Sequence, residues 1–172
     1  QEYPASYDGV VSVAAVNQSN TRTNYSNFGA SIDVTAPGGD LDEDADQDGT
    51  PDGVLSTIGN DRGSSITYGY RYYQGTSMSS PHVAGVAALM KSVAPNLTPA
   101  DFDRVLTEGR ISDDLGTEGR DDDFGYGLIN AMNAVSTAHE LATRTLAPPP
   151  TQLQLSPSTI DFGLTRSQQS FT

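Results

Sequence analysis

Cysteine is absent from the 172-residue chain, and basic residues are scarce. The lack of cysteine excludes disulfides but does not fix the redox compartment, because an oxidising location permits disulfides without requiring them. Only 9 Lys and Arg stand against 22 Asp and Glu, a net charge of −13. Phosphate binding needs clustered basic side chains. Long apolar runs are also missing, since none approaches the ~18 residues of a bilayer span. We therefore expect no nucleic-acid partner and no membrane span.

The length and the 35% content of hydrophobic residues predict about one domain with a core of its own. The chain does not open with a charged segment followed by an apolar one, as a signal peptide would. Its first residue is Gln1 rather than Met, and it begins in the middle of a pattern. We therefore expect a fragment whose natural start, with any signal peptide, lies upstream.

Short apolar, β-branched runs and helical patterns follow one another along the chain. Residues 10–16, "VVSVAAV", are typical of a buried strand, and residues 31–38 and 53–58 are weaker strand candidates bounded by Gly or Pro. After Ser77 comes a helix that is apolar nearly all round, which places it inside a domain. Strands with buried helices between or after them favour an α/β layered domain.

Two further helices have their own sequence signals. Thr98 is a candidate N-cap, with Pro99 at the first helical position and Asp101 three residues after the cap, which is a capping-box arrangement. The last helix is expected from about Asn130 because apolar residues then recur at i, i+3, i+4 and i+7. These residues are Ala131, Ala134, Val135 and Ala138.

We expect the α/β domain to occupy residues 1–142. The proline-rich "TLAPPPTQ" predicts a semi-rigid linker at residues 143–152. The alternation in "LQLSPSTIDFG" then predicts strands. About twenty residues cannot bury a core alone, so residues 153–172 are interpreted as the first strands of a truncated all-β, β-sandwich-like domain.

The acidic segment "DEDADQDGTPDG" at residues 42–53 has the spacing of a loop that wraps a hard cation. Counted from Asp44 as the first place, aspartates occupy the first, third and fifth places, and Gly49 in the sixth permits a sharp turn. Further oxygen donors follow in the seventh and ninth places. The spacing predicts structural calcium. Leu55 replaces the bidentate Glu of a full EF-hand, and a solvated acidic loop without a ligand is the alternative. The expected ligands are Asp44, Asp46, Asp48, Thr50 and Asp52.

The segment "GTSMSSPHVAG" at residues 75–85 places Ser77 at the start of the apolar helix. A serine hydroxyl is a poor nucleophile unless a base and oxyanion donors are within reach. The free N–H groups and the positive dipole end of a helix N-terminus favour negative charge there, and the small neighbours Gly75 and Ser79 would let a substrate backbone approach. These local features fit a nucleophile or a helix cap, and capping is the commoner role of such a serine.

Longer segments are spread over residues 3 to about 140 around "GTSMSSPHVAGVAALM". They are "YPASYDGVVSVAAV" from Tyr3, "YSNFGASIDVTAPG" from Tyr25, "GVLSTI" from Gly53, "YYQGTSM" from Tyr72 and "GYGLINAMNAV" from Gly125. In sequence, order and spacing these segments resemble the subtilisin-like serine proteases (subtilases, peptidase S8 type), and "GTSMSSPHVAGVAALM" is similar to the motif around the catalytic serine of that family.

By this resemblance Ser77 is the nucleophile of peptide-bond hydrolysis by acyl transfer, and its N–H is one of two oxyanion donors. His82 is not the base, because the histidine of this motif is structural in subtilases and the base lies in an upstream H-G-T-H segment. Geometry agrees, since five residues along a helix correspond to about 500° of rotation. His139 has no motif around it and is expected to be a cation near a helix C-terminus.

The chain contains no H-G-T-H segment, no D-T-G or D-S-G for the triad aspartate, and no A-A-G-N segment for the oxyanion asparagine. We therefore expect the C-terminal half of a catalytic domain that is inactive alone. The resemblance implies a doubly wound, mostly parallel sheet, of which this chain holds the later part. With the acidic surface and the calcium loop, it implies a secreted, extracellular, monomeric endopeptidase acting on polypeptides.

The alternative function is a non-catalytic secreted calcium-binding or adhesive module, a pseudoenzyme on the same scaffold.

The resemblance also suggests a second cation site. Asp33 matches the position of a weak cation site in some subtilases, together with carbonyls near Ala5 and Tyr7. An aspartate that caps a loop is the other interpretation of Asp33. The sequence does not predict the cleavage specificity.

Overall fold

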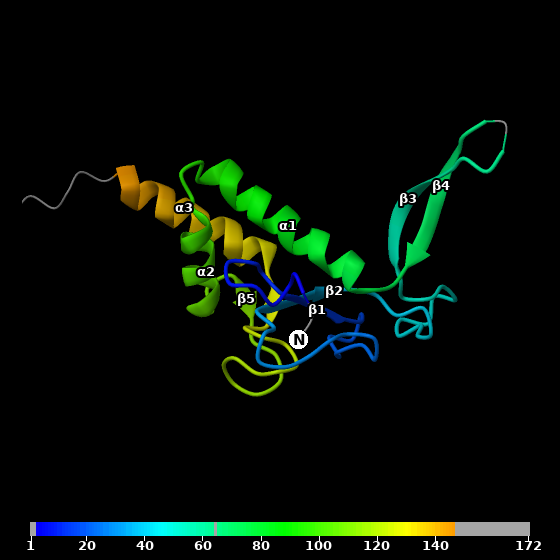
Figure 1. Cartoon of the computed structure of the whole chain (residues 1–172), viewed down its shortest axis with the longest axis horizontal. Helices are drawn as coiled ribbons and strands as arrows, with labels where there is room; N and C mark the ends of the chain where they lie inside the picture. Colours follow the sequence, from blue (N-terminus) through cyan, green and yellow to red (C-terminus); the bar gives the residue numbers. More distant parts are fainter. Residues whose placement is uncertain (1–2, 64, 147–172) are drawn as a thin grey trace, which may run out of the picture.

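The structure is a computed structural model that describes residues 3–63 and 65–146 (Figure 1). The predicted β-sandwich-like domain at residues 153–172 lies outside the described residues, as does most of the predicted linker. Helix α3 (Ala131–Leu146) continues beyond residue 142, so residues 143–146, expected to begin the linker, are helical.

The central sheet has four strands in the order β1-β2-β6-β5. Strands β1 (Val13–Val16) and β2 (Val34–Pro37) are parallel, and β2 is also parallel to β6 (Leu128–Ile129). Strand β5 (Ser112–Asp113) runs antiparallel to β6 at the edge. β1 and β2 are largely buried on both faces, as expected for apolar strands of a parallel sheet. The expectation of an α/β fold with a mostly parallel sheet is confirmed.

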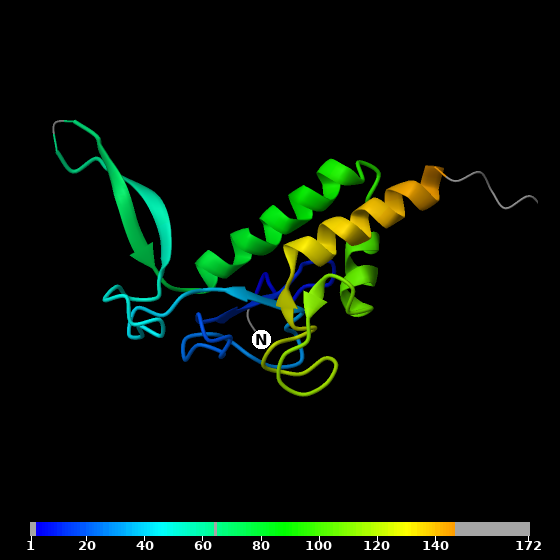
Figure 2. The ribbon, with the colours of Figure 1, turned by 180° about the vertical axis from the view of Figure 1, so that it is seen from behind.

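A separate antiparallel hairpin projects away from this sheet (Figures 1 and 2). It consists of β3 (Val54–Asn60) and β4 (Thr67–Tyr73), paired from Val54 opposite Tyr73 to Asn60 opposite Thr67. Most of its residues are exposed. The chain passes directly from β4 into helix α1 (Thr76–Val93).

The local signals predicted for the other two helices are present. Helix α2 (Pro99–Thr107) starts with the expected capping box: the Asp101 N–H donates to the Thr98 hydroxyl at 3.2 Å, and the Thr98 N–H donates to the Asp101 carboxylate at 3.0 Å. In front of α3, the side-chain oxygen of Asn130 accepts the Asn133 N–H at 3.0 Å. Ala134 and Ala138 of α3 are fully buried, whereas Ala131 is exposed.

The helices and the sheet share one core. Helix α1 packs against β1 and β2 and alongside α3 (Figure 1). The cluster joins buried side chains of all three helices to strands β2 and β6. Its largest fully buried members include Met90, Val105 and Val34. None of the described helices is both long and apolar enough to cross a bilayer.

One face of α1 does not fit the expectation of an all-round buried helix. Ala84, Ala88 and Leu89 are exposed, Leu89 to 49%. The prediction is wrong for this face because no element of residues 3–63 and 65–146 packs on it. Helices on the second face of the sheet, which a doubly wound fold requires, are likewise not found in that part of the chain.

The loop between β5 and β6 is organised around one carboxylate. Asp121 accepts three backbone N–H groups, from Phe124 at 2.8 Å and from Thr117 and Asp123 at 2.9 Å. Burial by itself raises the pKa of Asp121, but the three hydrogen bonds favour the ionised form and together leave the pKa below its ordinary value. The loop is therefore held by a carboxylate that stays ionised.

Candidate active site

Ser77 is the second residue of α1 and is exposed. The N-cap is Gly75, with φ 142° and ψ 161°, and no side chain caps the helix. Glycine suits this position, because side chains rarely tolerate such a φ. The helix-cap interpretation of Ser77 is therefore wrong: its hydroxyl stands at the helix start with no hydrogen bond to another described residue.

Backbone contacts from the end of β2 fix the start of α1. The Gly75 N–H donates to the Gly38 carbonyl at 3.0 Å, and the Met78 N–H donates to the Gly75 carbonyl at 2.9 Å. The Leu41 N–H donates to the side-chain oxygen of Gln74. The first N–H groups of a helix have no intrahelical acceptor and lie at the positive end of its dipole. The Ser77 N–H is thus at the end of the helix where a negative charge is stabilised.

The packing beneath this helix start leaves no spare room. Ser79 is fully buried, and its hydroxyl has no hydrogen-bond partner among the residues that the structure describes. Gly38 lies against it so closely that an added Cβ would stand 2.6 Å from Ala15 Cβ, 2.7 Å from the Tyr25 hydroxyl and 2.8 Å from Ser79 Oγ. Burial raises the pKa of Tyr25, whose neutral hydroxyl donates to the Gly39 carbonyl at 2.5 Å. The sequence patterns gave no sign of this contact between Gly38 and α1.

Neither histidine is placed to serve Ser77. His82 is exposed, and its Nδ1 lies 2.7 Å from the carbonyl oxygen of Met78, one helical turn back. His139 is exposed in the middle of α3, and the helix continues about two turns further, through Leu146. The expectation of a cation at the C-terminal end of that helix is therefore wrong, because the predicted helix was too short. No hydrogen bond joins either imidazole to Ser77.

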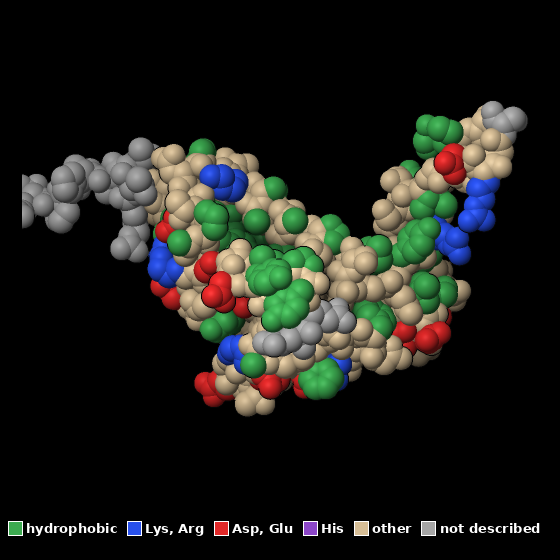
Figure 3. All heavy atoms as spheres, in the orientation of Figure 1, with side chains coloured by type: hydrophobic (Ala, Val, Ile, Leu, Met, Phe, Trp, Pro, Cys, Tyr) green, Lys and Arg blue, Asp and Glu red, His purple; other side chains and the backbone are tan. Residues whose placement is uncertain are grey.

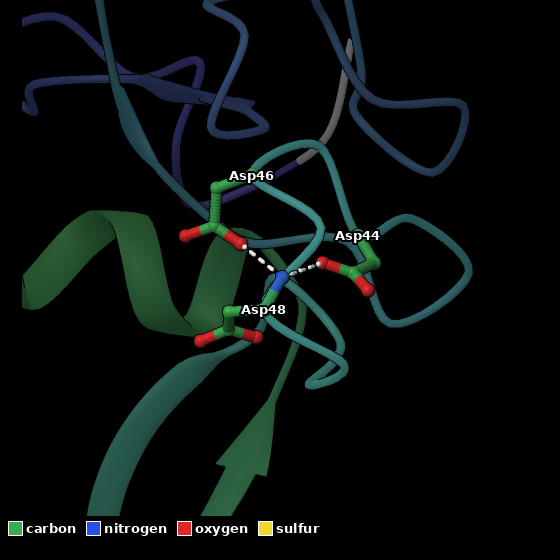
Figure 4. Close-up of side chains that lie close together, drawn as sticks. All are labelled: Asp44, Asp46 and Asp48. Atoms are coloured by element: carbon green, nitrogen blue, oxygen red, sulfur yellow. Dashed lines mark hydrogen bonds between the residues drawn. The ribbon is translucent and has the colours of Figure 1, made fainter.

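The acidic loop brings three of its predicted ligands together (Figure 4). One carboxylate oxygen each from Asp44, Asp46 and Asp48 lies within 4.8 Å of the other two. The Asp48 N–H donates to Asp44 at 3.1 Å and to Asp46 at 3.2 Å, and the Gly49 N–H donates to Asp44 at 3.1 Å. Gly49 has φ 84°, as the predicted sharp turn requires. Three exposed carboxylates that converge in this way could bind a metal ion.

The other two predicted ligands, Asp52 and Thr50, are not part of this group but make hydrogen bonds within the same loop. The Asp52 carboxylate accepts the Ala45 N–H at 2.6 Å, and the Thr50 N–H donates to Asp48 at 2.7 Å. The two ends of the loop meet where Asp40 and Asp52 form an isolated antiparallel bridge. The donor set is made only of oxygen atoms, which suits a hard cation.

Asp33 lies at a second polar site. Together with Ala5 and Tyr7, it lines a cavity of about 410 Å³. Its carboxylate accepts the Ser12 N–H at 2.7 Å. Burial raises its pKa, and the hydrogen bond from Ser12 opposes that shift. The structure thus places together the three residues that the resemblance associated with a weak cation site.

Comparison with known proteins decides the family. The sequence profile of the subtilase family matches residues 1–127. The chain belongs to the subtilase family. An extracellular protease of Xanthomonas campestris pv. campestris is 38% identical over 136 residues, which cover 78% of this chain and 21% of the relative. A thermophilic serine proteinase of Bacillus sp. (strain AK1) is 39% identical over 133 residues, 77% of this chain and 27% of the relative.

Solved structures agree with the sequence comparison. A protease from Pseudoalteromonas arctica superposes with a TM-score of 0.64 at 40% identity, and the match covers 79% of this chain and 38% of that protein. Fervidolysin from Fervidobacterium pennivorans, described as a keratinolytic enzyme related to subtilisin, superposes with a TM-score of 0.62 at 30% identity. Its match covers 87% of this chain and 21% of that protein. This subtilase chain therefore spans well under half the length of these relatives.

Proposed function

We propose that Ser77 is the nucleophile of a serine endopeptidase that hydrolyses polypeptide substrates. The observation that carries the proposal is the position of Ser77: exposed, second in α1, and free of any capping role. The names of related subtilases, an extracellular protease and a serine proteinase, support the same reaction.

In the proposed reaction, Ser77 Oγ attacks the carbonyl carbon of the scissile bond and forms a tetrahedral intermediate. Its proton passes to an imidazole base, which then protonates the amine as the peptide C–N bond breaks and an acyl-enzyme remains. The same base next takes a proton from a water molecule, whose oxygen attacks the acyl carbon and releases the carboxylic product and free Ser77. The Ser77 N–H, held at the helix start by the Gly75 to Gly38 hydrogen bond, donates to the developing oxyanion. The carboxylate that orients the base and the second oxyanion donor, an asparagine, complete the site.

In this proposal the base comes from outside these 172 residues, which is supported by the absence of a hydrogen bond from His82 or His139 to Ser77. The uncovered apolar face of α1 supports a missing partner half of the domain. Beside that face lies a cavity of about 550 Å³. Its lining includes Val11, Val13, Val83, Ala84, Ala87 and Phe102. We infer that the upstream half of the domain covers this surface, which would complete a doubly wound fold, and that the chain alone does not hydrolyse peptides.

We also propose that the Asp44, Asp46 and Asp48 group holds structural calcium, with the Thr50 carbonyl and Asp52 as further ligands. Convergent carboxylates repel one another, and a divalent cation would reverse that repulsion. The ion would stabilise the base of the β3–β4 hairpin, because the loop ends where the hairpin begins. It would take no part in bond cleavage.

Secretion and a monomeric state belong to the same proposal. Related subtilases are named extracellular proteases, and an excess of acidic residues favours solubility and opposes self-association. The competing function is a pseudoenzyme, a secreted calcium-binding or adhesive module. The hydroxyl of Ser77, exposed and not used as a cap, favours the enzyme.

Hydrolysis of an unstructured polypeptide by the full-length protein tests the proposal. We expect activity in the native protein, none in Ser77→Ala, and none in the isolated 172-residue chain. A Ser80→Ala variant is a matched control, because Ser80 is an exposed serine of the same helix. Equal hydrolysis by the native protein and Ser77→Ala would contradict the assignment. Equal activity of the isolated chain and the full-length protein would contradict the missing base.

A further inference from the structure

The β3–β4 hairpin carries an aromatic surface on one side. Alternate residues of a strand share one face, and directly paired residues of neighbouring strands share it too. Tyr68 and Tyr70 are therefore on the same face as Tyr72, and Tyr72 pairs with Leu55. The exposed fractions are 84% for Tyr68, 75% for Tyr70 and 53% for Leu55. We call these four residues the tyrosine face.

An uncovered face of this kind needs a physical reason. A two-stranded hairpin alone is marginally stable in water, and large exposed apolar side chains that gather in one place mark interaction surfaces. Within residues 3–63 and 65–146, nothing covers the rings of Tyr68 and Tyr70. Tyrosine also suits a binding surface, because it offers a large rigid contact area with a polar tip.

The charge of the hairpin differs from that of the rest of the molecule. Between residues 54 and 73 there are two arginines, Arg62 and Arg71, and one acid, Asp61, so the hairpin is net positive on a chain of net charge −13. Figure 3 shows green, blue and red side chains along it. The adjoining loop, residues 40–52, is strongly acidic. Arg71, however, pairs with Ser56 and therefore lies on the opposite face of the hairpin from Tyr70 and Tyr72. The strand residues of the tyrosine face carry no charge, so this face offers aromatic and aliphatic contacts.

The base of the tyrosine face is close to Ser77 along the chain. Only Gln74, Gly75 and Thr76 separate the end of β4 from Ser77. From Tyr68 to Tyr72 the strand extends about 13 Å, which about four residues of an extended polypeptide would span. A chain bound at Ser77 can therefore continue along the hairpin.

We propose that the tyrosine face binds a remote part of the polypeptide substrate, a stretch with aromatic or aliphatic side chains. This inference rests on the proposed endopeptidase function. It means that the enzyme selects among polypeptides by their sequence several residues away from the scissile bond. It predicts that long substrates of this composition are cleaved more efficiently than short ones.

The test compares three substrates with one cleavage sequence in the full-length protein. The first is a hexapeptide. The second has extensions of ten residues rich in Tyr and Leu at both ends, and the third has extensions of equal length and charge rich in Ser and Gly. In the variant Tyr68→Ser/Tyr70→Ser, kcat/KM for the second substrate should fall about tenfold, the loss expected for two aromatic contacts. The values for the other two should not change.

Phe28→Ser is the matched control, since Phe28 is similarly exposed, to 64%, but lies outside the hairpin. It should change none of the three values. Binding of the second peptide to Ser77→Ala, followed by fluorescence anisotropy with and without the two tyrosines, tests the surface independently of hydrolysis. Absence of hydrolysis in the native protein would contradict the endopeptidase, and tyrosine-dependent peptide binding would still support the surface.

Three results would overturn the proposal. One is an equal loss for all three substrates, which would show a structural role for the tyrosines. Another is no loss with any substrate and no tyrosine-dependent binding. The third is a dimer, detected by sedimentation, that the double variant dissociates, because the tyrosine face would then bind a second copy of the protein.

Discussion

Gly38→Ala should damage both the stability of the domain and the position of Ser77, the proposed nucleophile. The new methyl group would stand within 3 Å of three side chains, those of Ala15, Tyr25 and Ser79. Ser79 and Ala15 are fully buried, so they cannot move aside without disturbing the core. Overpacking of this kind costs about 1 to 3 kcal/mol.

The effect on activity follows from what Gly38 holds. Its carbonyl accepts the N–H of Gly75, the N-cap of α1. Relief of the clash would shift β2 and α1 apart and displace Ser77 relative to its base. A displacement of about 1 Å can lower the rate by about two orders of magnitude. We expect kcat/KM to fall by about 10- to 100-fold at a temperature where the protein is still folded.

Gly69→Ala is the matched control, because a Cβ at Gly69 would meet nothing within 4 Å and the residue has no positive φ. The assays are thermal unfolding and peptide hydrolysis by the full-length protein, with the same substitution of a glycine in both variants. Gly69→Ala should change neither. If Gly38→Ala were as stable and as active as Gly69→Ala, the tight contact between β2 and α1 would not exist as described.

Further predictions concern the cation loop, a buried hydroxyl and pH. Calcium at about 100 times its Kd should raise the free energy of unfolding by roughly 2.7 kcal/mol, so a chelator should lower the Tm of the full-length protein. Asp48→Ala should abolish this response to the chelator. Asp42→Ala should keep it, because the Asp42 carboxylate is outside the cluster. Thr35→Val should raise the free energy of unfolding by about 1 kcal/mol, because the buried Thr35 hydroxyl has no hydrogen-bond partner within the described part of the chain. Thr137→Val should lower it, because the Thr137 hydroxyl donates to the Arg110 carbonyl at 3.3 Å. The pKa of Asp121 is lowered in the folded protein, so its ionisation stabilises the fold above about pH 4, and this contribution is lost as the pH falls through the folded-state pKa. Denaturant titrations should show that Asp121→Asn is less stable than the native protein at pH 7 and that the two differ less at pH 2. The same difference in stability at both pH values would contradict the role of ionisation.

Strong local signals in the sequence predicted much of the fold. The apolar runs that became β1 and β2 and the capping box at Thr98 each depend on neighbours in the chain, so they can be identified without tertiary information. Strand β4 was missed because its tyrosines alternate on an exposed hairpin, where no buried face produces the usual hydrophobic period. The length of α3 was underestimated because the proline-rich segment obscured its end.

The candidate site was only partly predictable for the same reason. Asp44, Asp46 and Asp48 converge because they are close in sequence, whereas the contact of Gly38 with Ser79 joins segments far apart in the chain. Local pattern could not separate a nucleophile from a cap at Ser77, since both occur at helix starts. The structure excludes the capping role, because Gly75 is the N-cap. Burial of α1 was overestimated because its sequence shows how apolar the helix is and not what covers it.

The most direct measurement of the central claim is covalent labelling of the full-length protein with a fluorophosphonate, followed by digestion and mass spectrometry. The reagent reacts with an activated serine, and a nearby unactivated serine is unreactive. The account predicts a single adduct on Ser77, and none in Ser77→Ala. An adduct on Ser79 or Ser80, or no labelled serine at all, would contradict the assignment of Ser77 and favour a pseudoenzyme.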